Sequence, residues 1–145
     1  MQPELWKGGL SVDDRGEVGF VNDFDFSGVR RFYTVSNHAH GFVRAWHGHR
    51  HETKYVFVAA GAALVCCLEP DDWDSPSRDL PVLRFVLSER LPAVLRIPPG
   101  YVNGFMTLVA QTKIVFFSSS TLEESLADDI RFSARYWDPW QVEER

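Results

Sequence analysis

The chain has 145 residues, of which 45% are hydrophobic and 24% charged, and its formal net charge is −5. This length suits one domain over residues 1–145 with a core of ordinary size. The acidic balance and the lack of a basic run exclude the phosphate-neutralising surface of a nucleic-acid-binding protein. No apolar stretch approaches the ~20 residues of a membrane-spanning helix, so we expect a soluble, cytoplasmic protein with no membrane contact.

Short segments rich in Val, Phe, Tyr, Ile and Thr recur along the chain, separated by turn residues. They cover residues 16–22, 29–36, 41–46, 54–61, 62–69, 81–88, 93–98, 103–109 and 112–120. Many short strands at close spacing predict an all-β, antiparallel sandwich or barrel. The only helical pattern covers residues 121–130, with Thr121 as the expected N-cap and Glu124 three residues later.

Three histidines, His47, His49 and His51, alternate along a segment flanked by strand-forming residues. Residues at i, i+2 and i+4 of a strand share a face, so these side chains are expected to point the same way, at least the first two toward the core. Histidines together with carboxylates bind zinc or iron, and histidine also carries protons at physiological pH. The cluster alone leaves metal, acid/base and structural roles open.

The segment resembles the first motif of the cupin barrel, which has a glycine, five residues, His-x-His, a glutamate and a later glycine. Gly41, His47, His49 and Gly61 match this motif. Lys54 stands where the family has its ligand glutamate. An ammonium group is a poor ligand and repels a divalent cation, so this position argues against a metal.

The second cupin motif resembles PPGYVNG at residues 98–104, where Asn103 replaces the ligand histidine. Two of the family's four metal ligands are therefore replaced, and we expect no catalytic metal. His51 or Glu52 could still complete a ligand set. A metal-dependent cupin oxygenase therefore stays open as the least favoured alternative.

The order and spacing of DDRGEVGF, GFVRAWHGH, TKYVFVAAGAALV and IPPGYVNGF resemble two groups of cupin-fold deoxysugar enzymes. These are the dTDP-4-dehydrorhamnose 3,5-epimerases and the dTDP-4-keto-6-deoxyglucose 3,4-ketoisomerases. The resemblance runs from about Val12 to Trp137 and implies a jelly-roll cupin fold and an isomerase that acts on a dTDP-4-keto-6-deoxyhexose. It also implies a homodimer in which the N-terminal strands contribute to the neighbour's sheet and site.

The epimerase resemblance assigns roles to five residues. RAWH corresponds to the epimerases' Arg-Gly-Leu-His motif, which makes His47 the general base. Arg44 of this motif and Arg15 of DDRG occupy positions that contact the nucleotide diphosphate in the family. Lys54 corresponds to a lysine near the sugar, which suits enolate stabilisation, and Asn103 lies in the loop that shapes the pocket mouth.

The ketoisomerase resemblance rests on VRRFYTV and WHGH. In that group both histidines carry protons, which gives His49 a role beside His47. Arg31 and Tyr33 would then help to hold the sugar. The sequence therefore combines features of both groups.

Two departures from the epimerases affect the expected chemistry. Phe116 stands where the epimerases carry their catalytic tyrosine, and phenylalanine cannot donate a proton. The C-terminal extension that supplies the aspartate partner of the base histidine has no counterpart, and Asp138 is the candidate to replace it. These departures keep a non-catalytic nucleotide-sugar-binding cupin open as an alternative to the enzyme.

Both reactions share one chemical plan. A 4-ketone acidifies the neighbouring C–H bonds, a base takes the proton, a cation holds the enolate oxygen, and an acid returns a proton. No redox cofactor is needed, in keeping with the lack of a glycine-rich dinucleotide motif. The sequence therefore predicts a cofactor-independent isomerase with a small-molecule nucleotide-sugar substrate.

Overall fold

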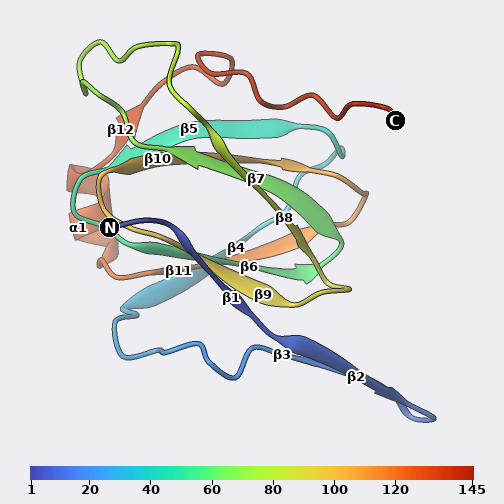
Figure 1. Cartoon of the computed structure of the whole chain (residues 1–145). Helices are drawn as coiled ribbons and strands as arrows, with labels where there is room; N and C mark the ends of the chain where they lie inside the picture. The colour runs from blue at the N-terminus through green and yellow to red at the C-terminus, as the bar shows by residue number, and fades with distance from the viewer.

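The computed structural model describes residues 1–145, and strands form most of its regular structure (Figure 1). Each of the nine predicted segments holds a strand, and three further strands, β1, β2 and β12, form beside them. The elements are β1 (Glu4–Lys7), β2 (Gly9–Asp13), β3 (Gly16–Phe20), β4 (Arg31–Val35), β5 (Val43–His49), β6 (Lys54–Ala60), β7 (Ala62–Leu68), β8 (Leu83–Ser88), β9 (Ala93–Ile97), β10 (Tyr101–Thr107), β11 (Lys113–Ser118), α1 (Leu122–Ala127) and β12 (Ile130–Arg131).

Two five-stranded antiparallel sheets face each other (Figure 1). One sheet, here called the β6 sheet, has the order β1-β9-β6-β11-β4. The other, called the β5 sheet, has the order β12-β5-β10-β7-β8. This arrangement confirms the all-β, jelly-roll prediction in its sandwich form, since the sheets do not close into a barrel.

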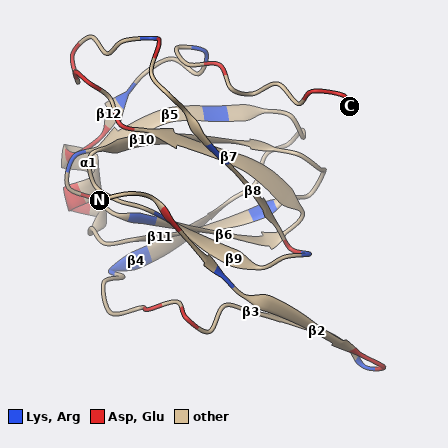
Figure 2. Cartoon of the chain, in the orientation of Figure 1, with Lys and Arg blue, Asp and Glu red and all other residues tan.

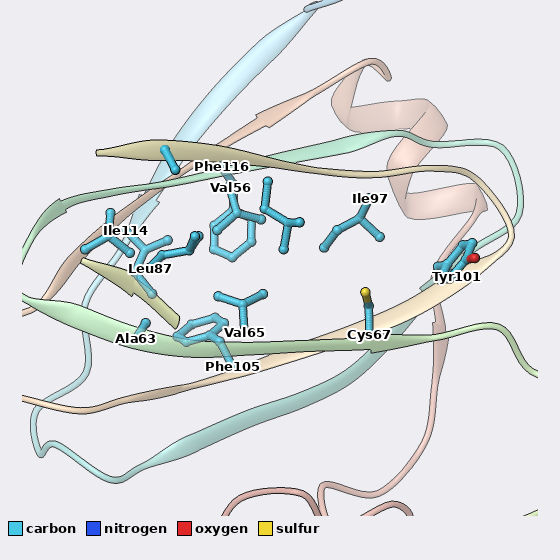
Figure 3. Packing of buried hydrophobic residues seen from close by; sticks show 13 residues of the cluster. Val56, Ala63, Val65, Cys67, Leu87, Ile97, Tyr101, Phe105, Ile114 and Phe116 are labelled. Atoms are coloured by element: carbon cyan, nitrogen blue, oxygen red, sulfur yellow. The ribbon is translucent and has the colours of Figure 1, made fainter. Parts of the chain in front are cut away.

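The main core fills the space between the two sheets (Figure 3). Its 13 buried residues include Val56 and Ile114 from the β6 sheet and Val65 from the β5 sheet. Full burial of side chains of this kind stabilises the fold by roughly 1.5–3 kcal/mol each. Phe105 and Phe116 belong to this core and also line the cavity described below, so apolar packing supports the site directly.

A second apolar cluster lies on the outer face of the β5 sheet, beneath the C-terminal segment. Trp46 is fully buried there, and its ring lies 5.5 Å from that of Trp137 and 5.0 Å from that of Trp140. The Trp46 indole N–H donates to the Trp137 carbonyl at 3.0 Å. Because Trp46 fills the outer face, the adjacent His47 points to the inner face, toward the opposite sheet.

Gly48 separates the two histidines of β5, and a side chain there would clash with its neighbours. A Cβ at this position would lie 2.5 Å from a Trp73 ring carbon and 2.8 Å from a Val102 methyl. We predict that Gly48→Ala lowers the free energy of unfolding by about 1–3 kcal/mol. Gly28→Ala is the matched control, because its nearest atom would be 3.5 Å away. Urea unfolding of both variants measures the difference, and equal stabilities would contradict this packing.

The predicted helix forms as α1 and lies at one end of the sandwich (Figure 1). Its capping box is complete, because the Thr121 hydroxyl accepts from the Glu124 N–H while the Glu124 carboxylate accepts from the Thr121 N–H. A cap of this kind is worth ~1 kcal/mol. Figure 2 shows acidic residues on α1, whereas Lys and Arg occur in strands of both sheets.

Strands β2 and β3 pair only with each other and form a hairpin that projects away from the sandwich (Figure 1). Val12 and Val18 of this hairpin are 68% and 64% exposed. Arg15 lies in its turn, where the guanidinium contacts the Asp13 carboxylate at 2.5 Å. A two-stranded hairpin is at best marginally stable alone, and the valine side chains of this one are exposed. The structure contains no helix with the length and apolar character needed to cross a bilayer.

Candidate active site

A cavity of about 240 Å³ lies between the two sheets, next to α1. Seven of the eight residues predicted for the site line it. They are His47, His49, Lys54, Arg31, Tyr33, Arg44 and Asn103. Arg15 is not among them, because the projecting hairpin holds it away from the cavity of its own chain.

The two sheets contribute opposite walls with different chemistry. The β6 sheet supplies Lys54 from β6, Tyr33 from β4 and Phe116 from β11. The β5 sheet supplies the two histidines from β5, with Asn103 on β10 opposite His47 in register. A molecule in the cavity would therefore have imidazoles on one side and an ammonium with a phenol on the other.

A bulge in β5 sets the face on which Arg44 lies. Asn103 pairs with His47 and Phe105 with Arg44, so residues 103–105 of β10 lie opposite residues 44–47 of β5, which has one extra residue. In a regular strand, residues three apart point to opposite faces, but the extra residue lets both Arg44 and His47 line the cavity. The expectation that His51 shares the histidine face is wrong, because His51 lies beyond the end of β5 and is exposed.

A backbone contact fixes the orientation of the His49 ring. Its Nδ1 lies 2.6 Å from the backbone carbonyl of Asp128, which can only accept, so Nδ1 carries the hydrogen. Its Nε2 is buried and has no hydrogen-bond partner within the protein. His49 therefore has its Nδ1 engaged by the backbone and its Nε2 left without a protein partner, while its side chain lines the cavity.

His47 is kept uncharged near neutral pH. Burial is the main cause, followed by the positive charges of Arg131 and Lys54, and together they lower the pKa of His47 from 6.5 to about 4. The Asp129 carboxylate acts in the opposite direction. A neutral imidazole in a partly buried cavity is ready to act as a base.

The His47 pKa makes stability depend on pH. The unfolded chain binds this proton near pH 6.5, whereas the folded chain binds it only near pH 4. The contribution is thus fully present above about pH 6.5 and is lost as the pH falls toward 4. We predict that His47→Asn flattens the loss of stability between pH 7 and pH 4.5, as measured by urea unfolding. An unchanged pH dependence in the variant would contradict this prediction.

Lys54 and Glu52 form a buried charged pair at the cavity. The side chains of Lys54 and Glu52 are 11% and 0% exposed, and Nζ lies 3.5 Å from Oε2 of Glu52. The Ser125 hydroxyl of α1 donates to the other carboxylate oxygen. The Lys54 ammonium also donates to the Tyr33 phenol oxygen at 2.5 Å. The carboxylate thus holds the ammonium charge at the cavity wall.

Three guanidinium groups lie around the cavity. Arg31 donates to the Ser125 hydroxyl at 2.7 Å, and Arg44 donates to the Asn37 amide oxygen at 2.7 Å. Arg131 of β12 lines the cavity beside His47, its partner in register, and contacts Asp129 at 3.0 Å. Arginine at such positions suits phosphate groups, which it can bind through two parallel hydrogen bonds.

Several residues line the cavity or its charged groups without a signal in the sequence. Arg131 and Asp129 follow α1 in the chain and reach the cavity only because β12 pairs with β5. The sequence indicates Glu52 only as a possible metal ligand, and its charged pair with Lys54 has no sequence signature. Asp138, the suggested partner for the base histidine, instead contacts Arg135 at 3.0 Å and does not line the cavity.

The residues of the cavity do not gather the ligands of a metal centre. His47 and His49 share a wall, but no group of three or more His, Cys, Asp or Glu side chains in the structure could hold a metal ion. The ammonium of Lys54 faces the same cavity. The metal-dependent alternative therefore lacks a ligand set here.

Comparison with known proteins gives matches among solved structures only, since no protein-family model and no curated protein matches the chain. A dTDP-4-dehydrorhamnose 3,5-epimerase from Sulfolobus tokodaii is 25% identical, with a TM-score of 0.74 over 95% of this chain and 81% of that one. The same enzyme from Bacillus anthracis, with TDP and PPi bound, is 21% identical, with a TM-score of 0.75 over 98% and 86%.

A sugar 3,4-ketoisomerase from Thermoanaerobacterium thermosaccharolyticum, in complex with TDP, is 17% identical, with a TM-score of 0.68 over 93% of this chain and 91% of that one. Members of both groups named from the sequence motifs are therefore similar to this chain over most of its length. The predicted resemblance to cupin-fold deoxysugar enzymes is confirmed, and the chain shares their fold.

Proposed function

We propose that the protein is an isomerase that acts on a dTDP-4-keto-6-deoxyhexose in deoxysugar biosynthesis. The reaction begins with removal of a proton from a carbon next to the C4 ketone. One observation carries this proposal: a single cavity holds two histidines on one wall and a lysine with a tyrosine on the other. The fold shared with dTDP-sugar epimerases and ketoisomerases supports the substrate class.

The residues divide the chemistry as follows. His47, neutral because its pKa lies near 4, removes the proton, and Lys54 holds the enolate oxygen that develops. His49 relays or donates a proton through its free Nε2. Ionic stabilisation of an enolate is strong in a cavity that excludes water, because charges there are poorly screened.

The nucleotide binds at the mouth of the cavity. A volume of about 240 Å³ is below the ~300–1,000 Å³ of sites that enclose a drug-sized ligand, so it suits the sugar ring alone. Arg44 binds the diphosphate outside the ring, while Arg31 and Asn103 bind the sugar. The two cysteines are unpaired and buried, as suits a protein of the reducing cytoplasm.

A homodimer would complete the site. The β2–β3 hairpin exposes Val12 and Val18 and holds Arg15 far from its own cavity. If the hairpin packs on a second copy, its apolar residues are buried and Arg15 extends toward the partner's diphosphate. We predict a dimer for the wild type and a monomer for Val18→Asp in analytical ultracentrifugation. A monomeric wild type would contradict this assembly.

The proposal is tested by incubating the protein with dTDP-4-keto-6-deoxyglucose and following the sugar by NMR. We expect a new dTDP-sugar whose formation requires His47. A second candidate, a non-catalytic nucleotide-sugar-binding protein, is favoured by Phe116 at the position of the epimerases' tyrosine. Calorimetric binding of the dTDP-sugar, without any new sugar and without proton exchange, would favour that candidate instead.

A further inference from the structure

We infer that Tyr33 is the proton donor of this site and acts from the wall opposite the histidines, so that the reaction is an inversion at a carbon next to the ketone. This inference rests on the proposed function and goes beyond it in naming the acid and the stereochemical outcome. It starts from Phe116, which leaves the site without a phenol on β11.

The structure places another phenol beside that position. Tyr33 on β4 is the direct partner of Phe116 in the antiparallel register. The two rings stack at 5.3 Å with an interplanar angle of 12°, and both line the cavity. The phenol that is absent from position 116 on β11 is thus present at position 33 on the neighbouring strand β4, at the same level of the cavity wall.

The hydrogen-bond pattern leaves the phenol free to donate. The Lys54 ammonium has no lone pair, so it donates to the Tyr33 oxygen at 2.5 Å. This contact uses an oxygen lone pair and leaves the phenol hydrogen without a protein acceptor. An adjacent ammonium also stabilises the phenolate that remains after the proton has been given away.

The positions of acid and base decide the outcome. His47 and His49 lie together on the β5 sheet, and Tyr33 lies on the β6 sheet across the cavity. A proton removed on one face of the sugar and returned on the other inverts the carbon. Transfer to a neighbouring atom, which moves the ketone, is served instead by two carriers on the same wall. His47 and His49 share one wall and could serve that transfer, so the inferred inversion depends on the phenol of Tyr33, which supplies a proton carrier on the opposite face.

The proton balance closes within the site. His47 takes the proton from the carbon, and the C–H electron pair becomes the enolate that Lys54 stabilises. The enolate carbon then takes the proton of the Tyr33 hydroxyl from the opposite face. The phenolate recovers a proton from Lys54, which is reprotonated by water, and His47 releases its proton to solvent.

The test uses Tyr33→Phe and dTDP-4-keto-6-deoxyglucose in heavy water, followed by NMR. We expect inversion to fall about 10²–10⁴-fold. Deuterium exchange at the same carbon should continue within a few-fold of the wild-type rate and with retained configuration, because His47 still removes and returns the proton on its own face. The double variant Tyr33→Phe/Phe116→Tyr should recover part of the inversion, since it returns a phenol to the cavity. Tyr55→Phe, a buried tyrosine outside the cavity, should behave as the wild type.

Each other outcome is decisive. Unchanged inversion in Tyr33→Phe, or equal loss of inversion and exchange, would overturn the assignment of Tyr33 as the proton donor. A wild-type product with its ketone at C3 would contradict the inference that the reaction is an inversion. Lack of exchange in the wild type, with normal binding of the dTDP-sugar, would instead overturn the proposed function, and the inference with it.

Discussion

Replacement of His47 by asparagine is expected to reduce turnover of dTDP-4-keto-6-deoxyglucose by about 10²–10⁴-fold. Asparagine has a similar size and polarity but cannot act as a base, so the variant loses the base and keeps the packing of the cavity wall. The same variant should bind dTDP with nearly wild-type affinity, because the diphosphate contacts proposed for Arg44 remain. Steady-state assays by NMR or chromatography, with calorimetry for binding, measure both effects.

The matched control for this variant is His51→Asn. His51 lies four positions after His47 in the same histidine-rich segment, but it is exposed and does not line the cavity. Its replacement should leave turnover unchanged. Equal losses of turnover in the two variants would show that general damage to the segment, and not the loss of a base, explains the effect.

Replacement of Lys54 by methionine is expected to have two separable effects. Turnover should fall by about 10²–10³-fold because the enolate oxygen loses its cation. Stability should fall by about 3–5 kcal/mol, since the fully buried Glu52 carboxylate then lacks its partner. Activity assays and urea unfolding at pH 7 measure the two losses independently.

The double variant Lys54→Met/Glu52→Gln separates these effects. Removing both charges should return most of the stability, because no unpaired carboxylate stays buried, while turnover stays low. Full recovery of turnover in the double variant would show that Lys54 acts only as a structural partner of Glu52. A single variant with wild-type stability would show that the Lys54–Glu52 pair carries no stabilising interaction.

Much of the framework could be predicted from the sequence, because its signals are local. Strand-forming runs bounded by turn residues mark most of the strands, and the capping box of Thr121 and Glu124 marks the helix. The motif that joins His47, His49 and Lys54 lies on two consecutive strands. Its residues therefore reach one cavity once the two sheets face each other.

The rest of the site depends on contacts between distant residues. The buried Glu52 carboxylate accepts a hydrogen bond from Ser125, 73 positions away. Arg131 reaches the cavity through the two-residue pairing of β12 with β5. Arg44 shares a face with His47 only because of the bulge, which contradicts simple strand alternation. No local sequence pattern predicts any of these three contacts.

Arg15 and Tyr33 illustrate two further limits of sequence patterns. The DDRG motif indicates a diphosphate contact for Arg15, but in the folded chain this residue lies on a projecting hairpin and contacts Asp13. The sequence places Tyr33 on a strand near the sugar and does not reveal its hydrogen bond with Lys54. Only the pairing of β4 with β11 brings its phenol beside Phe116.

We propose that this cavity moves a proton at a carbon next to a ketone. The most direct measurement is the time course of the sugar proton signals when dTDP-4-keto-6-deoxyglucose is incubated with the protein in heavy water. We predict that the C3 or C5 proton signal disappears as deuterium enters, and that His47→Asn stops this exchange. Retention of both signals in the wild type, at protein concentrations that saturate the dTDP-sugar, would contradict the claim.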